Sequence, residues 1–162
     1  MSKKVFYGFI AVLTLAALAA MAVEWDSLPA RIPTHWGVRG HIDGWGPRWL
    51  LFVFAFLPAL MGTLFYWIPR LDPKRENYPR HELAFLVTMA VVVVIMAAVF
   101  WMSFATALGH PVRVSFILPL IMGLGFVIMG NFLPQVKFNH FFGVRTPWTL
   151  SNEEVWRRTH RA

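Results

Sequence analysis

The sequence predicts an all-α membrane protein with four transmembrane helices. Of its 162 residues, 57% are apolar and only 14% are charged, which leaves too little polar surface for a water-soluble globule. The apolar residues form four long stretches without Asp, Glu, Lys or Arg, each near the roughly 20 residues that cross a bilayer. Backbone groups in lipid must bond within their own segment, so these stretches are predicted to be helices. We expect one domain over residues 1–162, with spans at about 5–23, 49–69, 83–108 and 114–133.

The first apolar stretch allows two interpretations. It follows the basic Lys3 and Lys4 and ends near Ala20–Ala22, which is also the pattern of a secretory signal peptide with a small-residue cleavage site. The apolar run exceeds the roughly 7–15 residues of a signal peptide, so an uncleaved helix is preferred. Either interpretation sends the next polar segment across the membrane.

That polar segment, the loop at residues 24–48, contains the sequence IPTHWGVRGHIDGWG. Its glycines predict an ordered loop, with a tight hairpin turn at Asp43–Gly44. His35, His41 and Asp43 are candidate ligands for a divalent metal such as zinc, because imidazoles and carboxylates bind such ions. Their spacing matches no strong metal motif, so no metal is favoured, and a hydrogen-bonded pair within the loop is the preferred alternative.

The four spans contain no Asp, Glu, Lys, Arg or His and are interpreted as packing elements. Transporters and pumps usually keep ionisable groups at membrane depth, so this class of protein is disfavoured. Small residues instead recur at helical spacing, at Ala55, Ala59 and Gly62 in the second span and at Gly123 and Gly130 in the fourth. Such residues let helix backbones approach closely in lipid, so both faces are predicted to contact other helices.

The C-terminal segment, residues 134–162, is the second concentration of polar residues. Ser151 followed by Glu154 is the pattern of a capping box and predicts the start of a short helix. About ten residues do not hold a free helix in water, so we expect this helix on the bilayer surface or packed on the protein.

Four polar residues of this segment, Asn139, Arg145, Glu153 and His160, form a candidate binding or catalytic cluster. In the alternative interpretation, which the residues alone favour, the arginines meet lipid phosphates or helix carbonyls and Asn139 caps a turn.

Basic residues predict the orientation of the chain in its membrane. They concentrate in the N-terminal tail, in the loop between the second and third spans, and in the C-terminal segment. Cytoplasmic loops are enriched in Lys and Arg, so both termini are predicted to be cytoplasmic. The net charge of +7 then faces the anionic lipid headgroups of the bilayer, and nothing indicates a nucleic-acid partner.

Two segments, LPARIPTHWGVRGHIDGWG and NHFFGVRTPWTLSNEEVWRRTHR, resemble the SdpI family of bacterial membrane proteins. The residues that carry the resemblance are Pro33, His35, Gly40, Asp43, Trp45, Asn139, Gly143, Arg145, Thr146, Pro147, Trp148, Thr149, Leu150, Trp156, Thr159, His160 and Arg161. Family members typically continue into two further membrane helices, so a four-helix version or a shortened chain is expected here.

The resemblance implies a non-enzymatic protein that gives immunity to, or senses, a membrane-active peptide, the sporulation-delay toxin. It also implies a cytoplasmic transcriptional repressor as a possible partner, and it supplies no catalytic residues. On this hypothesis the ligand-binding residues are His35, Asp43, Trp45, Asn139, Arg145, Thr146, Trp148, Trp156 and His160.

Two other functions stay open from the sequence. One is a metal-dependent membrane hydrolase, in which the loop histidines and Asp43 hold the ion and Glu153 or His160 supplies a general acid or base. The other is an assembly partner whose helices dock another membrane protein.

Overall fold

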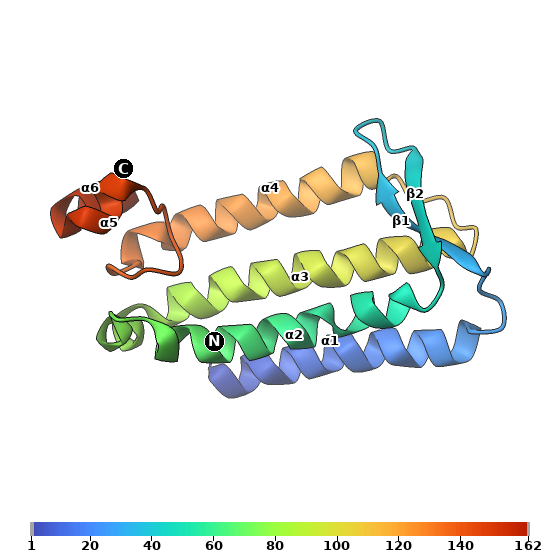
Figure 1. Ribbon diagram of the computed structural model, residues 1–162, viewed down its shortest axis with the longest axis horizontal. Coiled ribbons are helices and arrows are strands. Elements are labelled where there is room, and N and C mark those ends of the chain that lie inside the picture. Colours follow the sequence, from blue (N-terminus) through green and yellow to red (C-terminus); the bar gives the residue numbers. More distant parts are fainter. Residues whose placement is uncertain (1, 162) are drawn as a thin grey trace.

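The computed structural model describes residues 2–161, and it confirms the all-α membrane class (Figure 1). Four of its helices are long and apolar enough to cross a bilayer. They are α1 (Lys3–Glu24), α2 (Leu50–Leu71), α3 (Glu82–Ala107) and α4 (Val114–Phe132). They lie alongside one another, and α3 contacts α1, α2 and α4.

The packing of the helices follows their small residues only in part. On α2, Ala55 is buried, and a side chain at Gly62 would meet Ile10 of α1, as expected for a close helix contact. The predicted contact through Gly123 and Gly130 of α4 is wrong, since both face open space within the described chain. Because α4 packs on α3 with a different face, Gly125 takes their place and lies against Val91 of α3.

The loop between α1 and α2 is ordered, as predicted, but as a β-hairpin. Strand β1 (Arg31–Trp36) pairs with strand β2 (Ile42–Pro47) in antiparallel orientation. The predicted turn at Asp43–Gly44 is wrong, because this dipeptide lies inside β2. The chain reverses instead between Gly37 and Gly40, where Gly40 takes a φ of +79° and donates a 2.8 Å hydrogen bond to the Gly37 carbonyl.

The C-terminal segment packs on the protein and contains two short helices, α5 (Pro147–Ser151) and α6 (Glu153–Arg161). The predicted capping box at Ser151 is wrong. The side chain of Ser151 bonds back to the Trp148 carbonyl, and Asn152 instead accepts from the first N–H groups of α6. A capping box does exist one helix earlier, where Thr146 begins α5.

The connections gather at the two ends of the helix bundle (Figure 1). At one, the hairpin end, lie the β-hairpin and the connection between α3 and α4. At the other, the tail end, lie the start of α1, the 3₁₀ helices η1 (Arg75–His81) and η2 (Leu133–Gln135), and the tail helices α5 and α6. Each end has its own hydrophobic cluster, so each is a separately packed unit.

Candidate functional site

The hairpin is seated firmly on the helices beneath it. Ile32 of β1 is fully buried, and the hydroxyl of Ser103 in α3 donates a 2.5 Å hydrogen bond to the Pro33 carbonyl. At the tip, a side chain at Gly40 would collide with Ser115 of α4, so the turn lies directly on that helix. These contacts make the hairpin a rigid platform rather than a mobile loop.

The predicted pair within the loop is present on the outer surface of this platform. The ring Nδ1 of His35 lies 2.5 Å from Oδ1 of Asp43, across the two strands. The two side chains stay 72% and 51% exposed, and the neighbouring Trp45 is 49% exposed. Three of the predicted ligand-binding residues therefore gather on one accessible surface, and their polar and aromatic groups are available to a partner.

The third predicted metal ligand, His41, lies in the turn of the hairpin, just before β2. Its carbonyl accepts from the Gly37 N–H and closes the turn. Within residues 2–161 no three His, Asp or Glu side chains gather closely enough to hold a metal ion. The hairpin geometry thus brings together His35 and Asp43 as a pair and leaves His41 apart.

The tail end is organised around a buried carboxylate that the sequence analysis missed. Asp72, at the end of α2, accepts hydrogen bonds from the Tyr78 hydroxyl at 2.9 Å and from the N–H groups of Lys74 and His140 at 2.7 and 2.9 Å. Burial opposes ionisation of Asp72, but these hydrogen bonds outweigh it and hold its pKa below the ordinary value. Because His140 is 68 residues away, only a lone acidic residue directly after an apolar span signals this network in the sequence.

Asn139 is fully buried and fastens the loop that follows α4. Its side-chain amide donates to the carbonyls of Lys137 and Phe142, and its oxygen accepts from the N–H groups of Phe141 and Phe142. All four bonds are local, so the interpretation of Asn139 as the cap of a turn is confirmed.

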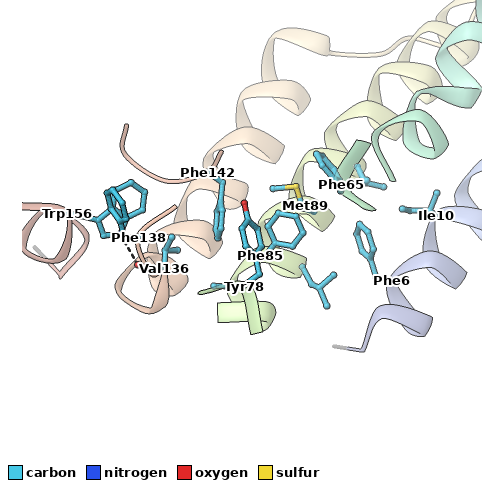
Figure 2. Close-up of a cluster of buried hydrophobic side chains, with 13 residues drawn as sticks. Phe6, Ile10, Phe65, Tyr78, Phe85, Met89, Val136, Phe138, Phe142 and Trp156 are labelled. Atoms are coloured by element: carbon cyan, nitrogen blue, oxygen red, sulfur yellow. Dashed lines mark hydrogen bonds between the residues drawn. The ribbon is translucent and has the colours of Figure 1, made fainter. Parts of the chain in front are cut away.

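The same end of the molecule buries Trp156 and His160 of α6. The indole of Trp156 donates a 3.0 Å hydrogen bond to the Val136 carbonyl, and it belongs to a row of apolar side chains that reaches Phe6 of α1 (Figure 2). The ring of His160 stacks on Trp156 and accepts from the Val144 N–H through Nε2, at 3.0 Å. Trp156 and His160 therefore hold the tail on the bundle.

Gly143 shows how closely the tail is packed. It has a φ of +109°, and a side chain there would collide with the His160 ring nitrogen and approach the Trp156 indole. Only glycine adopts this backbone conformation without strain. Gly143 is one of the residues that carry the SdpI resemblance, and the docking of α6 requires a glycine there.

The remaining tail residues that were predicted to bind a ligand are partly used within the tail and partly exposed. Thr146 caps α5 through hydrogen bonds exchanged with Thr149. Arg145 is exposed and donates to the His140 carbonyl, and Trp148 is 71% exposed. Of the predicted tail ligands, only Arg145 and Trp148 present side chains outward.

The structure does not bring together either combined site considered from the sequence. Glu153 and His160 line one cavity of about 240 Å³ beside α6, but Asn139 is buried with internal partners and neither it nor Arg145 lines that cavity. The four polar tail residues therefore do not form one common site. The hairpin and α6 lie at opposite ends of the bundle, and no single ion would contact both Asp43 and His160 (Figure 1). The arrangement that the hydrolase requires is therefore absent from the described residues.

Comparisons with known proteins agree with the two motifs. Residues 135–162 match the SdpI/YfhL protein family, and residues 12–62 match a domain family described as Domain of unknown function (DUF1648). The chain is 24% identical over 152 residues to Immunity protein SdpI of Bacillus subtilis (strain 168), covering 94% of this chain and 70% of that protein. No solved structure matches. These matches support the resemblance to the SdpI family, and the four long apolar helices fit a multi-pass membrane protein similar to that immunity protein.

Proposed function

We propose that this protein gives a bacterial cell immunity to a membrane-active peptide toxin, and that the hairpin is the surface that meets the peptide. The similarity to an immunity protein over nearly the whole chain supports the class of function. The observation that carries the choice of surface is the hairpin itself, which holds His35, Asp43 and Trp45 outward on a rigid seat.

The proposed orientation places the hairpin outside the cell and both termini in the cytoplasm. The start of α1, the connection between α2 and α3, and the tail share one end of the bundle (Figure 1). These segments contain most of the basic residues, which favours that end as the cytoplasmic one. A peptide that arrives from outside would then meet the hairpin first.

The hairpin surface suits an amphipathic peptide. The half-exposed Trp45 ring offers apolar area with a polar N–H group, and Trp49, at the start of α2, is also exposed. The Asp43 carboxylate, oriented by His35, offers a hydrogen-bond acceptor and a negative charge. We therefore expect a cationic or hydrophobic peptide to bind with an apolar side chain on the indole and a donor group on Asp43.

The test is the tolerance of a sensitive bacterial strain that expresses the protein, measured against a panel of membrane-active peptides. Expression is expected to raise the inhibitory concentration of at least one peptide, and Asp43→Asn or Trp45→Ala is expected to lower it again. Val38→Ala is the matched control, because Val38 is fully exposed in the turn of the same hairpin and lies outside the proposed surface. Unchanged sensitivity across the whole panel, at verified membrane levels, would contradict the proposal.

The outward side chains of the tail have a separate role in this proposal. Arg145 and Trp148 would face the cytoplasm and meet lipid headgroups or the transcriptional repressor that the family resemblance implies. Trp148→Ala is expected to leave peptide tolerance unchanged, since the tail lies at the end opposite the hairpin.

A further inference from the structure

A cleft with a basic rim opens at the tail end, away from the hairpin. It has a volume of about 840 Å³ and lies between α1, α2, η1 and the start of α3. Its rim contains Lys3, Lys4, Arg70 and Arg75 against a single acidic residue, Glu82. Glu82 pairs with Lys3 at 2.7 Å, and none of the ion pairs within residues 2–161 involves the other three cations. The cleft therefore has an excess of positive charge that its own residues do not neutralise.

The inner wall of this cleft is apolar and aromatic. Phe6 of α1, Phe65 of α2 and Phe85 of α3 are buried there, and Tyr78 packs edge-on against Phe85 (Figure 2). The Tyr78 hydroxyl is already bonded to Asp72, so it fixes the wall without offering a free polar group. A ligand of this cleft must match both a cationic rim and an apolar wall.

An apolar groove continues from the cleft along the outer surface of α1 and α2. It has a volume of about 560 Å³ and reaches Leu18 and Phe56. Tyr7 and Tyr66 line both the cleft and the groove, so the two join without a break. At the junction, the guanidinium of Arg70 lies 3.7 Å from the centre of the Tyr66 ring. The path thus runs from positive charge at the end of the bundle to mostly apolar surface along the spans, interrupted by Thr14 and Thr63.

We propose that this path binds one anionic phospholipid, with its phosphate at Lys4, Arg70 and Arg75 and an acyl chain in the groove between α1 and α2. Basic pockets between transmembrane helices bind anionic headgroups, because the headgroup charge is neutralised where the bilayer meets water. The continuation into an apolar groove selects a lipid over free phosphate, which would gain nothing from the groove.

The experiment measures lipid retained by the full-length protein in detergent, by native mass spectrometry during titration with phosphatidylglycerol or phosphatidylcholine. One phosphatidylglycerol is expected to bind, and phosphatidylcholine is expected to bind at least tenfold more weakly. Lys4→Gln with Arg75→Gln is expected to weaken phosphatidylglycerol binding about thirtyfold, the effect of removing two such surface charges. Arg158→Gln with Arg161→Gln is the matched control, since it removes the same charge at the same end outside the cleft.

A second pair of variants tests the groove. Ala11 is exposed and lines the groove, so Ala11→Phe is expected to fill it and to weaken phosphatidylglycerol binding. Ala19 is exposed on the same helix and does not line it, so Ala19→Phe is expected to bind like the original chain. Equal binding of both lipids, equal binding by the cleft variant and its control, or full competition by inorganic phosphate would overturn the proposal.

Discussion

Both ring nitrogens of His160 are used by backbone groups, and this determines its protonation state. Nε2 accepts from the Val144 N–H, so the proton of the neutral ring is on Nδ1, which donates to the Trp156 carbonyl at 2.9 Å. A second proton on Nε2 would face an N–H group and lose that hydrogen bond. Burial lowers the pKa of His160, and this effect outweighs the opposing hydrogen bond to Trp156.

This arrangement predicts that mild acid loosens the tail. The folded protein holds His160 neutral, whereas the undocked tail has the ordinary pKa near 6.5, so protons bind the undocked tail more readily. The His160 contribution to docking is therefore complete above about pH 6.5 and decreases as the pH falls below it. Hydrogen–deuterium exchange of residues 153–161, corrected for intrinsic rates, is expected to increase between pH 7.5 and pH 5. Equal protection at both pH values would contradict the claim that docking of the tail keeps His160 neutral.

A second residue-scale prediction concerns Gly143. Gly143→Ala would force a non-glycine residue to a φ of +109°, which costs about 1–2 kcal/mol, and would also push the new methyl into His160. Gly109→Ala is the control, because Gly109 also has positive φ but meets no atom within 4 Å. Thermal unfolding in detergent is expected to show a larger loss for Gly143→Ala. Equal losses would mean that only the backbone conformation matters at Gly143.

At the scale of elements, the hairpin depends on one buried hydroxyl of α3. Ser103→Ala would leave the buried Pro33 carbonyl without its donor, at a cost of about 1–3 kcal/mol. Thr106→Ala on the same helix is the control, because the Thr106 hydroxyl bonds only to the carbonyl of Met102 in its own helix. Ser103→Ala is expected to raise exchange of the β1–β2 amides and to lower peptide tolerance, while Thr106→Ala changes neither. Unchanged hairpin exchange in Ser103→Ala would show that Ile32 alone seats the strands.

The elements also show what the sequence predicts and what it does not. The spans follow from composition, because a bilayer imposes length and apolarity on each helix separately. The hairpin turn was placed wrongly because Asp43–Gly44 has strong local turn chemistry, whereas the actual turn depends on the fit of Gly40 against Ser115 on another helix. Likewise, Ser151 and Asn152 are adjacent and either could cap α6. In the structure Asn152 accepts from the N–H group of Glu154, and the Ser151 hydroxyl bonds to the Trp148 carbonyl instead.

At the scale of the whole molecule, the division into two ends yields a test of topology. His41 and Glu153 are both exposed, at the hairpin end and the tail end, and the chain has no native cysteine. In intact cells, a membrane-impermeant maleimide is expected to label His41→Cys, and to label Glu153→Cys only after lysis. Labelling of both positions from one side would refute the proposed orientation and the assignment of the hairpin to the outer surface.

The sequence predicts which residues belong to the candidate site, but not how they are arranged or which of them are exposed. The motifs identified His35, Asp43 and Trp45 together with the tail residues, but not that the first group is exposed and most of the second is buried. That distinction depends on Asp72 and Tyr78, which lie in a different connection and organise the tail through contacts distant in sequence. Residue types in a motif therefore show that a segment matters, and burial shows whether it serves folding or recognition.

The hydrogen bonds of Asp72 also impose an order on biogenesis. The ribosome synthesises Asp72 directly after the second span. Two of its hydrogen-bond donors, the backbone amide and the ring of His140, are synthesised only after the fourth span. Until then Asp72 must remain hydrated, because a buried charge without donors is costly. Closure of the tail end is therefore a late step in assembly, and it becomes favourable only when all four spans are in the membrane.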